Sequence, residues 1–516
     1  MDISEKIEEL LKYCSVYQGH ANMMDERRED EGFQVTLPEE EEIVAHLDKL
    51  QFILLTGEAG DGKSRLIRTL RKKLDENGFC EPYMDFSAET ETEKEKILTR
   101  IADTIDGKTK DKIMIAANVG IFTKYVMKYQ RALMGKLSQK NDRVKIINFE
   151  KRNLAQNKEI FQNIVEAFFS YNGKPCGNRD CRFYKKCAFQ ENLDFLLTKR
   201  GMESVRILCD AICLTGEHVT FRELLSLLAY MVTFGEGCRE RREKEEQEDF
   251  FVEAVFRQSN YLDKTLLNIS RMDPAFKNSK GGFLKYDSVE ECRREKRIRF
   301  FYGQENPYEL LAVDYLTEFQ NVISFFRETP FIDSAEIQSK ELYQVKRGLG
   351  RLTRRGQSDL AMKVADTPVM FGDDIQTEFE LGNIDMIWHR YGLDFENLDL
   401  EMHKPEEQNR FSISYVFQED EKINAITLVV DYKLFRYLLM ADGYYYLSHN
   451  NKSLEEYRIH SFYQKILKKK HGAYERMHVR FNNQAQKELC DFSLSVQHLN
   501  HFLKGQSTVV KIRKEG

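Results

Sequence analysis

Short apolar runs alternate with amphipathic stretches in the first third of the chain. Residues 52–55 (FILL) are an uninterrupted apolar run of the kind that forms a buried parallel strand, and the residues from about Lys63 to Leu74 have a helical pattern. Further apolar runs end at Asp85 (PYMD), at Asn118 (IMIAAN) and at Asn148 (VKIIN), with helical stretches between them. This alternation predicts βαβ units and a parallel sheet that is covered by helices on both faces.

The pattern changes twice further along the chain. A mainly helical stretch follows residue 196, is interrupted by a charged run at 238–249 and resumes as far as about residue 365. Polar and apolar residues then alternate over 412–417, and the apolar run 426–430 repeats the strand pattern. The predicted fold class is α/β. Its expected parts are a helical N-terminal segment (1–45), a parallel-sheet core (46–240), a helical region (250–365) and a C-terminal α+β domain (370–516).

Composition limits the classes of protein to which the chain can belong. Its 516 residues are 41% hydrophobic and 31% charged, which supplies several buried cores and excludes a disordered chain. The 78 Lys and Arg against 84 Asp and Glu give a net charge of −6, so a globally basic surface for nucleic acid is excluded, although local basic strips are not. The sequence shows neither a long apolar stretch nor an apolar signal core, and its ten cysteines are ordinary usage. We therefore expect a cytoplasmic protein with reduced thiols and no membrane contact.

Residues 57–64 (GEAGDGKS) match the pattern G-x-x-x-x-G-K-[ST] between the first predicted strand and the first predicted helix. Glycines let successive backbone N–H groups curl around a phosphate, and a helix N-terminus adds positive potential there. In such a loop the lysine, here Lys63, contacts the β- and γ-phosphates, and the following hydroxyl, here that of Ser64, ligates Mg²⁺. The sequence therefore predicts binding of ATP with Mg²⁺. The candidate nucleotide-binding residues are Gly57, Gly60, Asp61, Gly62, Lys63, Ser64 and Arg65.

Hydrolysis of ATP also needs an acid on the Mg²⁺ side of the nucleotide. Asp85 closes its apolar run and is the first candidate. Phe86 follows where many ATPases have a catalytic glutamate, so Glu89 or Glu91 would have to replace that group. In the alternative interpretation, Asp85 only caps a helix that begins near Thr92.

The reaction further needs a group that orients the attacking water. Asn118 ends the run IMIAAN, where its amide could lie beside the γ-phosphate. An asparagine at a strand end is also a good turn residue, which is the alternative interpretation. The candidate catalytic residues are therefore Lys63, Asp85 and Asn118.

Several stretches together resemble a known family. Between residues of about 50 and 360, the chain resembles the AAA-type ATPases of bacterial DNA phosphorothioation-dependent restriction systems. The stretches that carry the resemblance are GEAGDGKS, IAANVGIFTKYV, a three-cysteine segment, GEHVTFRELLSLLAYMVTFG, MDP and KRIRFF. The resemblance implies a P-loop NTPase core of the AAA type with a helical lid at 250–365. It also implies that Lys63 and Ser64 contact nucleotide and Mg²⁺ and that Asn118 is the sensor residue.

The same resemblance implies a function and partners. The chain would be the ATP-binding and ATP-hydrolysing subunit of an anti-phage complex that acts, with other restriction proteins, on DNA without the host's sulfur-modified backbone. The missing Asp-Glu pair is a departure from ordinary AAA proteins and leaves the rate of hydrolysis open. Two alternatives also stay open: a nucleotide-binding scaffold that recruits a separate nuclease, and an ATPase of another bacterial defence system. Assembly with further copies of the chain is open as well.

A cysteine-rich insertion is predicted at 171–192. Cys176, Cys181 and Cys187 fall within twelve residues (CGNRDCRFYKKC). Three thiolates in a short loop suit Zn²⁺ or, less well, an Fe–S cluster, with a fourth ligand from elsewhere in the chain. The nearest candidates for that ligand are Cys209, Cys213 and His218. In the alternative interpretation these are unrelated thiols in a reducing compartment.

Basic residues suggest two further kinds of contact. An arginine near the γ-phosphate would neutralise charge in the transition state, and the candidates are Arg222, Arg347, Arg351, Arg354 and Arg355. Two basic strips, 293–302 (RREKRIRFFY) and 465–471 (KILKKKH), could contact DNA phosphates, and the aromatic residues of the first could stack on unpaired bases. A solvated surface is the alternative interpretation of each strip.

Overall fold

The structure is a computed structural model, and the part of the chain that it describes has many gaps. The described residues are 3–14, 35–137, 141–149, 152–170, 180–183, 186–239, 252, 255–256, 264–277, 288–353, 362–364, 375–381, 386–393, 409–419, 422–443, 454–469, 474–482, 489–501 and 505–514. The chain forms two compact units. The first contains Met1–Cys213 and Glu217–Val313, and the second contains Leu214–Gly216 and Asp314–Gly516.

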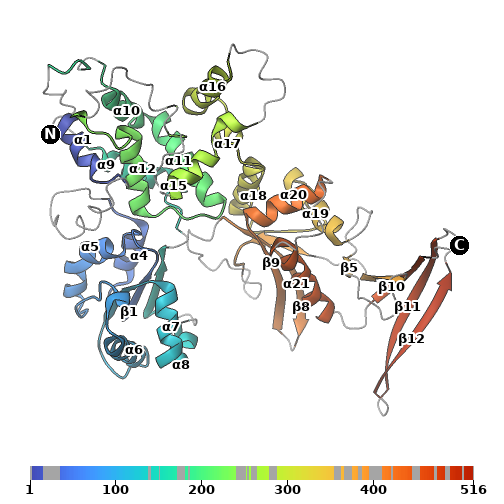
Figure 1. Cartoon of the computed structure of the whole chain (residues 1–516). Helices are drawn as coiled ribbons and strands as arrows, with labels where there is room; N and C mark the ends of the chain where they lie inside the picture. Colours follow the sequence, from blue (N-terminus) through green and yellow to red (C-terminus); the bar gives the residue numbers. More distant parts are fainter. Residues whose placement is uncertain are drawn as a thin grey trace. The chain divides into compact units, whose positions relative to one another are not determined.

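A three-stranded parallel sheet is the centre of the first unit (Figure 1). Its strands are β1 (Phe52–Thr56), β2 (Ile113–Ala117) and β3 (Val144–Asn148), in the order β2-β1-β3. Every residue of β1 and β2 is buried, which explains why both strands are continuous apolar runs. The last residues of the three strands are in register, so the strands end at one edge of the sheet. Three of the predicted strands are thereby confirmed.

The fourth predicted strand, which ends at Asp85, was wrong as a regular strand. This segment makes two isolated parallel bridges beside β2, one at Phe79 and one at Tyr83. Pro82 lies between them and lacks the N–H group that a continuous ladder would use. The chain therefore runs along the free side of β2 without adding a full strand to the sheet.

Helices cover both faces of this sheet, as predicted. The apolar side chains of α5 pack against Ile53 and Leu55 on one face, where α4 also contributes to the core. Phe52 and Leu54 point to the other face and pack with apolar residues of α6, α7 and α8. The bounds of these helices are α4 (Pro38–His46), α5 (Lys63–Glu76), α6 (Glu91–Ile105), α7 (Val119–Tyr129) and α8 (Arg131–Leu137).

The rest of the first unit is helical. Every residue of α12 is at least half buried, and this helix lies against α1, α10 and α15. These helices gather beside the sheet in Figure 1. Their bounds are α1 (Ile3–Leu11), α9 (Lys158–Phe168), α10 (Ala188–Leu196), α11 (Lys199–Leu214), α12 (Phe221–Thr233), α15 (Lys264–Arg271), α16 (Val289–Tyr302) and α17 (Pro307–Leu310), with short 3₁₀ turns η2 (Phe86–Ala88) and η4 (Pro274–Phe276).

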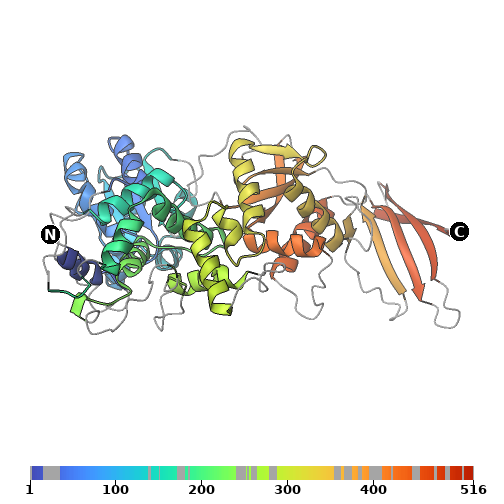
Figure 2. The ribbon, with the colours of Figure 1, turned by 90° about the horizontal axis from the view of Figure 1, so that it is seen from above.

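The second unit combines helices with two antiparallel sheets, which Figures 1 and 2 both show as separate sheets. The four-stranded sheet has the order β4-β7-β8-β9, and the strands predicted within 412–417 and 426–430 form its β8–β9 pair. The five-stranded sheet has the order β12-β11-β10-β6-β5. The strands are β4 (Phe331–Asp333), β5 (Met362–Val364), β6 (Ile375–Leu381), β7 (Ile387–Arg390), β8 (Phe411–Glu419), β9 (Lys422–Val430), β10 (Tyr474–Asn482), β11 (Leu489–His501) and β12 (Gly505–Lys514). The helices are α18 (Leu316–Glu328), α19 (Lys340–Thr353), α20 (Tyr432–Asp442) and α21 (Leu454–Lys469).

Among the helices of the described residues, none combines the length and the apolar character that a membrane crossing requires.

Candidate functional site

A tight loop of residues 57–62 joins β1 to α5 at the edge where the parallel strands end. Gly57, Gly60 and Gly62 have φ values of +153°, +100° and +91°, which residues with a side chain rarely adopt. Space is restricted as well. A Cβ on Gly57 would lie 2.6 Å from the Oδ2 of Asp61, and one on Gly60 would lie 2.9 Å from the Cβ of Arg222. The glycines of the sequence pattern are thus required by both backbone conformation and close packing.

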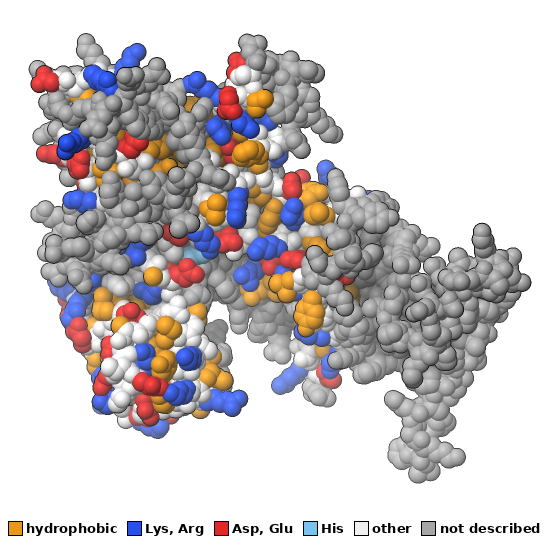
Figure 3. Space-filling model, viewed as in Figure 1, with side chains coloured by type: hydrophobic (Ala, Val, Ile, Leu, Met, Phe, Trp, Pro, Cys, Tyr) orange, Lys and Arg blue, Asp and Glu red, His pale blue; other side chains and the backbone are white. Residues whose placement is uncertain are grey.

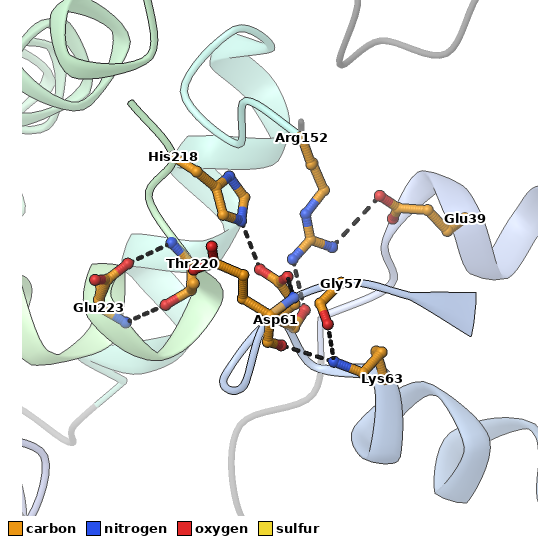
Figure 4. A network of polar contacts seen from close by, with 9 residues as sticks. Glu39, Gly57, Asp61, Lys63, Arg152, His218, Thr220 and Glu223 are labelled. Atoms are coloured by element: carbon orange, nitrogen blue, oxygen red, sulfur yellow. Dashed lines mark hydrogen bonds and ion pairs between the residues drawn. The ribbon is translucent and has the colours of Figure 1, made fainter. Parts of the chain in front are cut away.

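Lys63 lies at the first position of α5, directly after the N-cap residue Gly62. Its Nζ donates hydrogen bonds to the carbonyl oxygens of Gly57 at 2.8 Å and Glu58 at 2.7 Å (Figure 4). Ser64 follows at the half-buried second position of the helix. A lysine ammonium group, a hydroxyl and the N-terminus of a helix therefore meet at one loop, and this combination favours an anion.

The side chain of Asp61 is turned into the protein. It is 0% exposed, and its Oδ2 accepts a hydrogen bond from the Glu58 backbone N–H at 2.6 Å. Its Oδ1 lies 2.7 Å from the Nε2 of His218, which precedes α12 (Figure 4). The Asp61 carboxylate therefore bonds to the loop's own backbone at Glu58 and to His218, which is distant in the sequence.

Arg152 holds the backbone of the same residue. Its Nη2 donates a hydrogen bond to the Asp61 carbonyl oxygen at 2.7 Å, and its Nη1 lies 3.4 Å from the Oε1 of Glu39 in α4. The guanidinium group also lies 4.6 Å from the centre of the Phe149 ring. In this network the sequence predicts Asp61 as a nucleotide contact and His218 only as a candidate metal ligand. Arg152 and Glu39 were not predicted. No motif or spacing marks Arg152, because its partner Asp61 is 91 positions away.

Arg65, one of the predicted nucleotide-binding residues, makes contacts within the protein. Its Nη2 donates to the carbonyl oxygen of Val35 at 2.7 Å, and its guanidinium lies 5.5 Å from the centre of the Phe221 ring. Burial lowers the pKa of Arg65, partly offset by Glu40. The side chain thus links the first turn of α5 to the start of α12.

Asp85 and Asn118 lie at the same sheet edge as the loop. Asn118 directly follows β2 and caps α7, since its side-chain oxygen accepts a hydrogen bond from the Ile121 N–H at 3.2 Å. Asp85 is exposed, and its carboxylate accepts from the Ser87 N–H at 2.8 Å as the cap of η2. The expected cap of the following helix is therefore displaced: Thr90, and not Asp85, caps α6.

Glu91, a predicted substitute for the missing glutamate, is engaged elsewhere. Hydrogen bonds from Lys128 and Tyr129 lower the pKa of Glu91, so this carboxylate is a weak proton acceptor. Glu89 accepts a hydrogen bond from Lys94 through its backbone oxygen.

Arg222 is the predicted arginine that the structure places beside the loop. Its backbone N–H donates to the Gly60 carbonyl oxygen at 2.9 Å. Arg347 belongs to the second unit and pairs with Asp442 at 2.6 Å. Arg354 and Arg355 lie outside the described residues, as does the side chain of Arg351.

The predicted metal site is described only in part. Cys176 lies outside the described residues, whereas Cys181 and Cys187 are half buried near the start of α10. Within the described part of the chain, no three His, Cys, Asp or Glu side chains come together as metal ligands. Of the suggested fourth ligands, His218 bonds to Asp61, and Cys209 and Cys213 are buried in α11. The zinc expectation stays a prediction.

Half of the residues of the first basic strip are exposed, among them Arg294, Arg299 and Tyr302. Phe300 and Phe301 are fully buried, so the expectation that they stack on bases was wrong, whereas Tyr302, the third aromatic residue of the strip, is 53% exposed. Arg297 pairs with the buried Asp273, with the guanidinium Nη2 2.6 Å from Oδ2. Figure 3 shows Lys and Arg mixed with Asp and Glu over the described surface in that view. In the second strip Lys469 pairs with Glu419.

Comparisons with known proteins add no relative. No protein-family model, no curated protein and no solved structure matches the chain.

We expect Gly60→Ala to destabilise the first unit more than Gly78→Ala does. Both glycines have a positive φ, +100° and +76°, so each substitution should cost about 1–2 kcal/mol in backbone strain. Only the methyl group at position 60 meets another atom, because nothing lies within 4 Å of a Cβ on Gly78. Thermal unfolding midpoints of the two variants measure the difference, and equal losses would show that Arg222 yields freely to the added methyl.

Arg297→Met should cost about 3–5 kcal/mol in the free energy of unfolding, because it removes the cation that pairs with the buried Asp273 carboxylate and leaves this group, among the described residues, with the Ala275 N–H alone. Arg293→Met is the matched control on the same helix. The Arg293 side chain is 40% exposed and pairs with Glu290 one turn away, so its loss should cost less than about 1 kcal/mol. Urea unfolding of both variants tests this, and similar values would argue against a structural role for Arg297.

Proposed function

We propose that residues 57–64 bind the phosphates of Mg·ATP and that the chain hydrolyses the bound ATP as an AAA-type P-loop ATPase. One observation carries the proposal. A loop with three glycines in the left-handed region leads from a buried parallel strand into α5, with the Lys63 ammonium group beside it. Glycine backbone, a helix N-terminus and a lysine together suit the phosphates of a nucleotide.

Each residue of the loop has a role in this proposal. Lys63 exchanges its hydrogen bonds with the Gly57 and Glu58 carbonyls for contacts with the β- and γ-phosphates. Ser64 offers its hydroxyl to Mg²⁺, which neutralises charge on the phosphate oxygens when bound. Arg222, whose main chain touches Gly60, is the arginine best placed to approach the terminal phosphate from the same chain.

Asp85 and Asn118 complete the proposed catalytic set. Ligands of open α/β sheets bind beyond the carboxyl ends of the strands, and both residues follow segments that end at this edge. Asn118 follows the strand next to β1, whereas Asp85 follows the segment on the far side of β2. We assign water orientation to Asn118 and the Mg²⁺ side to Asp85.

The pathway proposal rests on the resemblance over residues of about 50 to 360. We assign the ATPase to a bacterial anti-phage restriction complex that depends on DNA phosphorothioation and contains other restriction proteins. The exposed Arg294 and Arg299 leave the first basic strip as a candidate for contact with DNA phosphates, although Phe300 and Phe301 are buried.

A second candidate is a nucleotide-binding scaffold with little turnover. The observation that favours it is the use of the candidate acids in local structure. Asp85 caps η2, and Glu91 binds Lys128 and Tyr129. Steady-state hydrolysis with and without DNA separates the two functions, because a scaffold binds ATP without releasing phosphate.

Lys63→Ala should abolish measurable binding of Mg·ATP, because it removes the cation beside the loop while leaving the fold intact. Lys72→Ala on the exposed side of the same helix is the matched control and should bind as wild type does. Isothermal titration calorimetry measures both affinities. Wild-type affinity in the Lys63 variant would refute a phosphate-binding role for this loop.

We also propose one structural Zn²⁺ per chain, held through Cys176, Cys181 and Cys187. Cys181→Ser should release the metal and lower the thermal unfolding midpoint, because a structural Zn²⁺ contributes folding free energy. Elemental analysis of protein purified without chelators gives the stoichiometry. Iron in place of zinc would indicate a cluster, and neither metal would show that the thiols are unrelated.

A further inference from the structure

We propose that Arg152 and His218 are positioning residues that keep the loop in its anion-binding conformation without touching the nucleotide. The inference rests on the proposed function, because it assigns the support of the same phosphate site. Both residues come from outside the loop and its motif, and both bind Asp61.

His218 acts on the Asp61 carboxylate. This group is fully buried, and His218 is 12% exposed, so water replaces their hydrogen bond poorly. The second oxygen of the carboxylate accepts the Glu58 N–H at 2.6 Å, which closes the loop on itself. Loss of His218 would leave one oxygen of a buried carboxylate without this partner, and the loop would gain freedom to turn Asp61 outwards.

Arg152 acts on the Asp61 carbonyl group. In a trans peptide the C=O of one residue and the N–H of the next point in opposite directions, so a bond to the Asp61 carbonyl also fixes the direction of the Gly62 N–H. Gly62 is the N-cap of α5, where backbone N–H groups would meet a phosphate. Arg152 is 5% exposed, and Glu39 and the Phe149 ring hold its guanidinium in place.

The preceding peptide is held in the same manner. The Arg222 N–H donates to the Gly60 carbonyl oxygen at 2.9 Å. Arg222 in turn has a fixed backbone, because Thr220 and Glu223 form a reciprocal capping box at the start of α12 (Figure 4). Two successive carbonyls of the loop are therefore anchored by separate segments, one after β3 and one in the first turn of α12.

The experiment compares His218→Leu and Arg152→Gln with His218→Gln, which keeps an N–H donor. Arg200→Gln is the matched control for Arg152, because Arg200 also donates to backbone carbonyls, those of Phe300 and Phe301 at 2.8 Å. Calorimetric titration with Mg·ATP should show affinity about 10- to 100-fold weaker for the first two variants, the effect of losing a hydrogen bond to a charged group. His218→Gln should keep most of the affinity, and Arg200→Gln all of it.

Amide hydrogen exchange without nucleotide provides the readout that separates the two proposals. Peptides that cover residues 57–64 should exchange faster in His218→Leu and Arg152→Gln than in wild type or Arg200→Gln. If wild type binds ATP and these two variants bind it equally well, the positioning role is overturned and the proposed function stands.

If wild type does not bind ATP but the loop exchanges faster in the variants, the proposed function fails and the anchoring stands. Unchanged exchange together with no binding overturns both. Should His218→Leu fail to fold, Asp61→Asn tests the same contact from the loop side, and unchanged exchange and affinity there would overturn the inference.

Discussion

A buried carboxylate inside a glycine-rich loop is the constraint on which the first unit depends. Asp61 is fully buried, and an ionised group in that position costs several kcal/mol unless it is paired and hydrogen-bonded. The Glu58 N–H and His218 satisfy its oxygens, while Arg152 binds its carbonyl group. The loop, the segment after β3 and the start of α12 therefore have to come together for this part of the chain to fold.

The same contacts relate the sheet to the helical part of the first unit. Arg222 lies so close to Gly60 that a side chain would not fit at position 60. The capping box sets the backbone at the start of α12, so that the Arg222 N–H points to the Gly60 carbonyl oxygen. α12 is deeply buried among α1, α10 and α15, so the position of its first turn is well defined. A change of loop conformation on nucleotide binding would be transmitted to α12 directly through the contact between Gly60 and Arg222, as the proposed motor or switch requires.

The side chains proposed for catalysis also take part in local structure. Asn118 and Asp85 each accept a backbone N–H as a cap, and Glu91 is bound by Lys128 and Tyr129. A cap uses one oxygen and leaves further capacity on the same group. Asp85 and Asn118 therefore hold their own local turns, and each still has capacity for a further contact.

Local pattern alone determined the three parallel strands, α5 and the glycine loop, because continuous apolar runs, helical spacing and the need for glycine at positive φ are properties of neighbouring residues. It did not determine the segment at Asp85, where Pro82 prevents a full strand, nor the burial of Phe300 and Phe301 beside exposed residues of the same basic strip. Arg152 and His218 were decided only by the tertiary structure. They meet Asp61 from 91 and 157 positions away. Such contacts follow from how β3 and α12 pack around the loop, and the spacing of residues in the sequence does not predict this packing.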